Sequence, residues 1–279
     1  MKKTTCLLLA STLGLSIPSY ALSDFEQTKA NMIQLGYSCQ GQAEGRAFHC
    51  QIRVPHYSMP IDIFISNSLR AADPTLVYYL HGFWLSVNPF DGPNGDFARF
   101  LVDAGRNAVL IIPESRGRNE TYANELNTAA KINRFTTEIE SALIRAGLAV
   151  TPTTPTLLAG HSGAYVAMGI IGSLAQELVR FRQLRGVSLL DSAYGYRTGL
   201  VSLNDILCQN GGGYYQQAFN PSDGSAGKRD TNRRIKRELN QSVHACPGRQ
   251  HEYLEDTRTG HYAFPRAHLT RFISQAIFW

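Results

Sequence analysis

The chain alternates short apolar runs with longer segments in which apolar residues recur at helical spacing. Strands that are apolar at nearly every position are predicted at Leu76–Leu80, Ala108–Ile112, Thr156–Ala159 and Gly186–Leu190. Helices are predicted after them at Asp96–Ala104, Asn127–Ala146, Tyr165–Phe181 and, at the end of the chain, Pro265–Trp279. Strands without a polar face are typical of a parallel sheet that helices cover on both sides. The pattern therefore predicts an α/β fold with a mostly parallel central sheet.

The remaining segments add further predicted strands and helices before and after these runs. Before the apolar runs we predict a helix and three strands, at Asp24–Leu35, Tyr37–Gln40, Ala47–Val54 and Ile61–Ile65. The first two of these strands are expected to pair antiparallel at one edge. After Leu190 we expect a looser region, and then a strand, a helix and a strand at Tyr214–Phe219, Thr231–Leu239 and His251–Leu254. No Pro/Gly/Ser-rich linker divides residues 22–279, which predicts a single domain.

The first 21 residues have the pattern of a secretory signal peptide. Lys2 and Lys3 precede the short apolar stretch from Cys6 to Ile17, and small residues in Ser19-Tyr20-Ala21 suit cleavage. The stretch is too short for a stable membrane span, and no other segment is long enough for one. We therefore expect cleavage after Ala21 and a secreted or periplasmic protein.

Export changes the interpretation of the cysteines. Once the signal is removed, Cys39, Cys50, Cys208 and Cys246 remain. An even number in an exported chain favours disulfides. Of the three pairings that four cysteines allow, we favour Cys39 with Cys50 and Cys208 with Cys246, because each pair closes a short local loop.

The net charge and the charged residues exclude few classes of function. The formal net charge is +5, with 18% charged and 43% hydrophobic residues, which suits a globular protein and does not by itself point to nucleic acid. The densest basic stretch, Lys228–Arg237, is interpreted as a solvated helix face, with attraction to an acidic envelope surface as the alternative. No phosphate loop, nucleic-acid module or metal-ligand cluster is recognisable, so we expect no metal and no cofactor.

The stretch Gly160-His161-Ser162-Gly163-Ala164 contains the strongest chemical signal. Ser162 stands where a predicted strand turns into a predicted helix, at the sheet edge where functional groups of parallel sheets gather. Small neighbours allow a tight bend that exposes the hydroxyl, as in a nucleophile elbow, although Ala164 replaces the usual last glycine. The alternative is that Ser162 caps the helix.

At this point the chain resembles the α/β-hydrolase superfamily, by the order of its elements and by three motifs. His81-Gly82-Phe83-Trp84 follows a strand as the oxyanion-hole turn of that superfamily does, and Gly160–Ala164 matches its elbow. Gly260-His261 comes after the last predicted strand, where the superfamily places its catalytic histidine. The resemblance implies an α/β-hydrolase fold and serine esterase or lipase-like chemistry.

The chemistry requires these residue types. A serine hydroxyl needs a base to remove its proton, a histidine can accept that proton and pass it on, and a carboxylate must orient the imidazole. We assign these roles to Ser162, His261 and an aspartate. The backbone N–H groups of Phe83 and Gly163 are the proposed oxyanion donors.

Two aspartates compete for the third role. Asp191 ends an apolar strand, where a carboxylate needs a partner, and pancreatic-type lipases are similar in placing their acid there. Asp223 follows a later strand but lies in the ordinary turn sequence Pro221-Ser222-Asp223-Gly224. We choose Asp191, with Asp223 second. Glu255 and Asp256 are too close to His261 in sequence to face it easily.

The predicted function is therefore an exported serine hydrolase that cleaves a carboxylic ester through an acyl-enzyme. Trp84 and Tyr194 are the predicted substrate contacts, and the substrate is expected to be a small or envelope-derived acyl compound rather than nucleic acid. An amidase or peptidase, an acyltransferase with the same residues, and a non-catalytic envelope protein are the alternatives. The sequence does not determine the oligomeric state.

Overall fold

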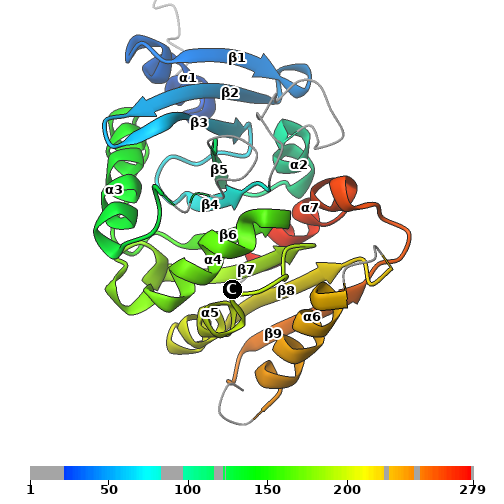
Figure 1. Ribbon diagram of the computed structural model, residues 1–279. Coiled ribbons are helices and arrows are strands. Elements are labelled where there is room, and N and C mark those ends of the chain that lie inside the picture. The colour runs from blue at the N-terminus through cyan, green and yellow to red at the C-terminus, as the bar shows by residue number, and fades with distance from the viewer. Residues whose placement is uncertain are drawn as a thin grey trace, which may run out of the picture.

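The computed structural model describes residues 22–82, 97–115, 122, 124–222, 226–241 and 246–277. Nine of its strands form one sheet in the order β1-β2-β3-β5-β4-β6-β7-β8-β9 (Figure 1). The strands are β1 (Ser38–Gln42), β2 (Ala47–Val54), β3 (Tyr57–Ser66), β4 (Thr75–Leu80), β5 (Ala108–Pro113), β6 (Thr156–His161), β7 (Leu184–Leu190), β8 (Gly213–Phe219) and β9 (Arg249–Glu255).

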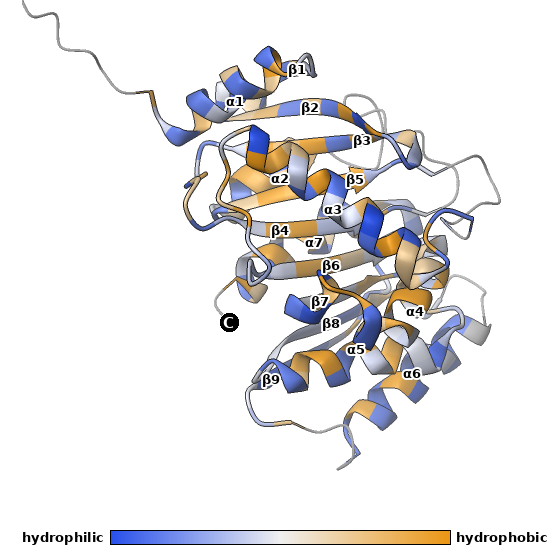
Figure 2. Cartoon of the chain, turned by 90° about the vertical axis from the view of Figure 1, so that its left-hand side faces the viewer, coloured by the Kyte–Doolittle hydropathy of each residue, from blue (hydrophilic) through white to orange (hydrophobic). Residues whose placement is uncertain are grey.

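Helices cover both faces of this sheet. They are α1 (Asp24–Gln34), α2 (Phe97–Ala104), α3 (Ala129–Arg145), α4 (Tyr165–Ser173), α5 (Arg197–Gln209), α6 (Ala226–Leu239) and α7 (Phe264–Ala276). One buried apolar cluster joins the sheet to α1, α3, α4, α5 and α6, and a second joins the other face to α2 and α7. The hydropathy colouring shows the central strands as largely apolar between helices with one polar side (Figure 2). This arrangement is the α/β-hydrolase fold that the sequence predicted.

The direction of the strands changes across the sheet. β1, β2 and β3 pair antiparallel, and β3 is also antiparallel to β5. From β5 through β4 to β9 every pair is parallel. The antiparallel edge is confirmed. β5 and β6 lie on opposite sides of β4, so the order in which strands are added to the sheet reverses at β4. Ligands bind at such switch points in open sheets.

The predictions for two segments after β6 were wrong. The predicted helix at Tyr165–Phe181 ends at Ser173, and short 3₁₀ turns continue the chain. Arg180 is 1% exposed and bonds Glu140 and the carbonyl oxygens of Thr151 and Thr154, which draws this segment inward. The looser region predicted after Leu190 contains a whole helix, α5.

The helix α5 is difficult to recognise in the sequence because it contains Gly199, a glycine that its close packing against α4 requires. A Cβ on Gly172 would lie 1.8 Å from the carbonyl oxygen of Gly199, and a Cβ on Gly199 would lie 2.0 Å from that of Gly169. The two helix backbones therefore touch where side chains are absent. Glycine lowers helix propensity, so the pattern weakens where the packing is tightest.

Both favoured cysteine pairs are at disulfide distance, Cys39 with Cys50 and Cys208 with Cys246. Over the described ranges, no helix combines the length and apolar character that crossing a membrane needs. The signal segment at residues 1–21 lies outside the described residues, so its cleavage and the single-domain boundary stay predictions.

We expect Gly172→Ala to lower the free energy of unfolding by about 1–3 kcal/mol, because the added methyl group must separate α4 from α5. Urea unfolding followed by circular dichroism measures the change. Gly41→Ala is the control, because no atom lies within 4 Å of a Cβ at Gly41. Equal midpoints for the two variants would show that the close approach is not tight.

Candidate active site

Ser162 lies in a strained turn between β6 and α4. Its φ is +53°, in the left-handed region that non-glycine residues rarely adopt. A Cβ on Gly160 would lie 2.2 Å from Sδ of Met168 and 3.2 Å from Cβ of Ala164. Small residues beside Ser162 are thus required for β6 and α4 to approach each other, as the elbow pattern predicted.

Three of the predicted side chains form one hydrogen-bonded chain. The Oγ of Ser162 lies 2.8 Å from Nε2 of His261, and Nδ1 of His261 lies 2.5 Å from Oδ2 of Asp191. With Nδ1–H donating to the carboxylate, Nε2 is left to accept the hydroxyl proton of Ser162. The three residues come from the ends of β6 and β7 and from the turn before α7, up to 99 positions apart.

The carboxylate of Asp191 is fully buried and uses both of its oxygens. Oδ2 faces His261, while Oδ1 accepts from Nζ of Lys228 at 2.7 Å and from the backbone N–H of Asn220 at 3.1 Å. Burial alone would raise the pKa of Asp191. The hydrogen bonds from His261, Lys228 and Asn220, together with the ammonium charge, outweigh that effect and lower the pKa below its ordinary value. Asp191 is therefore ionised at neutral pH.

Our interpretation of the basic stretch Lys228–Arg237 as a solvated helix face is correct for the exposed arginines, Arg229, Arg233, Arg234 and Arg237, but wrong for Lys228. The side chain of Lys228 is 1% exposed. The helix α6 begins at Ala226, earlier than the predicted Thr231, which brings Lys228 onto its buried face together with Asn232, Ile235 and Leu239. That i, i+4, i+7, i+11 spacing was visible in the sequence and could have identified Lys228 as an inward-facing residue.

The loop that carries His261 is fixed from two sides. The side-chain amide of Asn220 donates to the carbonyl oxygen of Thr259 at 3.1 Å. Asp256 accepts from the backbone N–H groups of Arg258 and Thr259 and from the hydroxyl of Thr259, and it also contacts His268 at 3.2 Å. Asp256 thus holds the loop and does not face His261, in agreement with its rejection as the acid.

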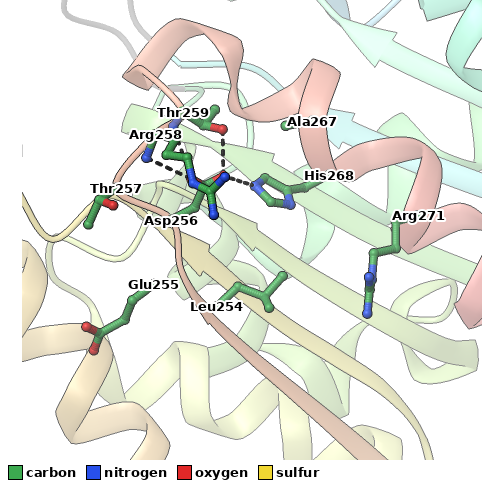
Figure 3. Close-up of a pocket in the computed structure, with 9 residues that line it drawn as sticks. All are labelled: Leu254, Glu255, Asp256, Thr257, Arg258, Thr259, Ala267, His268 and Arg271. Atoms are coloured by element: carbon green, nitrogen blue, oxygen red, sulfur yellow. Dashed lines mark hydrogen bonds and ion pairs between the residues drawn. The ribbon is translucent and has the colours of Figure 1, made fainter.

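Figure 3 shows Asp256 pointing into this network at the wall of a cavity of about 570 Å³. The cavity is lined by residues of β9, of the following loop and of α7. Ser162, His261 and Asp191 are not among the lining residues. The cavity is therefore separate from the three-residue chain.

Two further histidines support the site without joining the chain. The ring of His161 lies 4.8 Å from that of His261, and its Nε2–H donates to the carbonyl oxygen of His261 at 2.8 Å. Burial, followed by the nearby His261, lowers the pKa of His161 to about 3, so it is neutral. This contact joins residues 100 positions apart in sequence, which no local pattern reveals.

His81 fastens the turn after β4 to the end of β5. Its Nδ1–H donates to the carbonyl oxygen of Gly82 at 2.9 Å, and its Nε2 accepts from the N–H of Ser115 at 3.2 Å. The hydroxyl of Tyr122 accepts from the N–H of His81 and donates to the carbonyl oxygen of Pro113. Burial lowers the pKa of His81 to about 4, which keeps this ring neutral. His81 therefore has a structural role, because it connects the turn after β4 to the residues that follow β5.

The turn after β4 lies directly against Ser162. A Cβ on Gly82 would lie 2.4 Å from Cβ of Ser162 and 2.9 Å from its Oγ. Gly163, one predicted oxyanion donor, is buried at the start of the turn into α4. The other donor, Phe83, and the predicted substrate contact Trp84 lie outside the described residues, so both assignments stay predictions. The same holds for the alternative acid Asp223.

Tyrosines surround the exposed side of His261. The ring of Tyr194 is 6.5 Å from that of His261, and the ring of Tyr262 is 5.2 Å away. Tyr165 packs against Tyr194 and Tyr196 at 5.6 and 6.0 Å. Tyr262 and Tyr196 are 50% and 52% exposed. Tyr194 is thus beside the hydrogen-bonded chain, as its predicted role requires.

Glu114 also ends a strand at this edge. Its carboxylate lies 3.5 Å from the side-chain amide of Gln51, and burial raises its pKa to about 6, with Asp62 adding to the effect. Within the described ranges, no group of three or more His, Cys, Asp or Glu side chains is arranged to hold a metal ion.

Comparisons with known proteins identify the fold. No protein-family model matches the sequence, and no curated protein matches it. Among solved structures, an S-formylglutathione hydrolase from Agrobacterium tumefaciens is similar, with 13% identity, a TM-score of 0.52, and 83% of this chain and 96% of that chain covered.

Two further structures agree with this result. The feruloyl esterase module from Clostridium thermocellum has 10% identity and a TM-score of 0.54, over 83% of this chain and 87% of that chain. The BES protein from Bacillus cereus has 11% identity and a TM-score of 0.51, over 85% and 96%. At these identities the likeness shows the fold, and the chain has the α/β-hydrolase fold.

The lowered pKa of Asp191 predicts a pH-dependent contribution to stability. A carboxylate with a depressed folded-state pKa stabilises the fold above its unfolded pKa of about 3.9, and the contribution is lost as the pH falls through the folded-state pKa. Asp191→Asn should lower the free energy of unfolding by about 3–5 kcal/mol at neutral pH, because the buried ammonium of Lys228 loses the negative charge of Asp191 beside it.

Urea unfolding at neutral pH and near pH 3 tests this expectation, and the difference from wild type should shrink at the lower pH. Asp103→Asn, at an exposed position of α2, is the matched control and should unfold as the wild type does at both pH values. A penalty for Asp191→Asn that is the same at both pH values would contradict the ionised state of Asp191.

Proposed function

We propose that this protein hydrolyses carboxylic esters through an acyl-enzyme formed on Ser162. The observation that carries the proposal is the continuous hydrogen-bonded chain from the Ser162 hydroxyl through His261 to the ionised Asp191. This is the arrangement that nucleophilic catalysis by serine needs, because the hydroxyl has an acceptor for its proton and that acceptor is itself oriented by a carboxylate.

The reaction follows from these contacts. Nε2 of His261 takes the hydroxyl proton as Oγ of Ser162 attacks the carbonyl carbon, and Asp191 stabilises the imidazolium that forms. The tetrahedral oxyanion is stabilised by backbone N–H groups, for which Gly163 and Phe83 are the candidates. His261 then donates its proton to the departing alkoxide as the ester C–O bond breaks. Water, activated by the same imidazole, attacks the acyl-enzyme and releases the acid.

An ester is favoured over an amide for a chemical reason. An alkoxide leaving group demands less of the general acid than an amine does. The similar structures include proteins described as a feruloyl esterase module and an S-formylglutathione hydrolase, which supports cleavage of an acyl group on this fold. Tyr194, with Trp84, is the proposed contact for the substrate.

Export is part of the proposal. The apolar segment before Ala21 provides the signal, and the two cysteine pairs at disulfide distance suit an oxidising compartment. The natural substrate is then a small or envelope-derived acyl compound that the protein meets outside the cytoplasm.

Ser162→Ala is expected to lower kcat for p-nitrophenyl acetate by at least about 10⁴-fold, because the attacking oxygen is removed. The thermal unfolding midpoint should not fall. Labelling by a fluorophosphonate probe, measured by intact mass, should disappear together with activity. Retention of either would place the nucleophile elsewhere.

The reaction class is tested with the wild-type protein. Matched ester and amide substrates with the same acyl group, assayed with and without an alcohol acceptor, separate an esterase from an amidase and from an acyltransferase. We expect ester cleavage with the free acid as the main product. Faster amide cleavage, or mainly transfer to the alcohol, would contradict the proposed class.

Gly82→Ala should lower kcat/KM by at least about 100-fold, because the new methyl group would displace Ser162 by a substantial fraction of an ångström or more. Gly260→Ala is the control, since it lies next to His261 but has no atom within 4 Å of its Cβ position. Steady-state kinetics on the same ester measure both. Equal activity of the two variants would show that Ser162 tolerates a larger neighbour.

A further inference from the structure

Lys228 occupies an unfavourable place for a cation. It is the third residue of α6, at the helix end where the macrodipole is positive, and its side chain is buried. A buried ammonium is costly unless a carboxylate pairs with it. Desolvation accordingly lowers the pKa of Lys228, while the bond to Asp191 and its charge oppose that change. Its contact with Asp191 supplies the opposite charge that a buried ammonium at this position requires.

That contact divides the carboxylate between two partners. Oδ2 of Asp191 faces His261 and Oδ1 faces Lys228, on the opposite side of the same group. Rotation of the carboxylate would break both bonds, so the ammonium fixes the oxygen that His261 uses. The N–H of Asn220 also reaches Oδ1, but at the longer distance of 3.1 Å. Lys228 also lies 5.5 Å from the ring centroid of Tyr194, which packs over it.

The ammonium also sets the charge balance around the imidazole. The groups that face His261 among the described residues are Asp191, Ser162, His161, Tyr194 and Tyr262. His161 is neutral, and burial raises the pKa of the Tyr194 phenol beyond the physiological range, so it is neutral too. The negative charge of Asp191 is therefore opposed mainly by Lys228.

An unopposed carboxylate would favour the protonated imidazole before substrate arrives, and a protonated base cannot accept the serine proton. We propose, on the basis of the function proposed above, that Lys228 is a positioning residue. It holds Asp191 in the rotamer that faces His261 and offsets part of the negative charge beside the imidazole, so that Nε2 of His261 can accept the proton of Ser162.

Lys228→Met tests both effects, because methionine keeps the unbranched apolar stem and removes the ammonium. We expect kcat for p-nitrophenyl acetate to fall roughly 10- to 100-fold with KM unchanged, since small misplacements of a catalytic group have effects of this size. The acidic limb of the plot of kcat/KM against pH should move up by about one unit. Lys228→Arg keeps the charge and should return this limb toward its wild-type position.

Lys236→Met is the matched control. Lys236 is on the same helix, but its ammonium lies over the ring of Tyr253, 4.0 Å from the centroid, rather than beside Asp191. This variant should keep the wild-type kcat and pH profile. If its profile moves as far as that of Lys228→Met, a general loss of positive charge explains the shift and the inference is wrong.

Active sites are counted with the fluorophosphonate probe, so that kcat is calculated per folded, competent molecule. Thermal unfolding measures the stability of each variant separately. A Lys228→Met protein with a lower unfolding midpoint but a wild-type kcat and pH profile would make Lys228 only an anchor for α6, which overturns the inference. A lower kcat without movement of the acidic limb, unrestored by arginine, would overturn it as well.

Ser162→Ala, assayed in parallel, separates this inference from the proposed function. If wild type is labelled and active and Ser162→Ala is neither, the proposed function stands whatever the Lys228 variants show. If wild type is neither labelled nor active on esters, the proposed function fails and the role of Lys228 fails with it. A working wild type with an unchanged Lys228→Met profile rejects the Lys228 inference alone.

Discussion

The buried negative charge of Asp191 is the constraint on which the site depends. A carboxylate removed from water must be compensated by donors and opposite charge, or the chain loses several kcal/mol. Here the donors come from three different segments, namely the turn bearing His261, the start of α6 and the residue that follows β8. Solvating this one group therefore draws together parts of the chain that are 29 to 70 positions apart in sequence.

The parallel sheet makes that convergence simple. Strands that run in the same direction deliver their following residues to one edge, so β4, β6 and β7 bring Gly82, Ser162 and Asp191 next to one another. Two of these residues, Ser162 and Asp191, also have positive φ angles, of 53° and 48°. Sharp turns at these points aim the side chains out of the strand direction, and the strain is compensated by the surrounding contacts.

The sequence predicted those elements and site residues whose place in the fold follows from the local pattern of the chain. The alternation of apolar runs and helices predicted the sheet, and the rule that strand ends share an edge led to Ser162 and Asp191. His261 was chosen from the resemblance to the α/β-hydrolase superfamily. Lys228 was missed because its role depends on where α6 begins and on the path from β8, which no local pattern reveals. The helix α5 was missed because Gly199, needed for contact with α4, weakens the helical signal. Phe83 and Trp84 rest on the resemblance of their motif alone.

The disulfide between Cys208 and Cys246 has a consequence for the edge of the sheet. It joins the end of α5 to the segment just before β9, a strand whose only described neighbour in the sheet is β8. On the chain-entropy view, closing a loop of 38 residues stabilises the folded protein by roughly 4 kcal/mol, because it lowers the conformational entropy of the unfolded chain. Arg249, at the first position of β9, adds bonds to Asn204 and to the carbonyl oxygen of Leu239. An outer strand would ordinarily be the first part of a sheet to fray, and here that fraying is opposed at the amino-terminal end of β9, the strand whose other end leads on to the imidazole of His261.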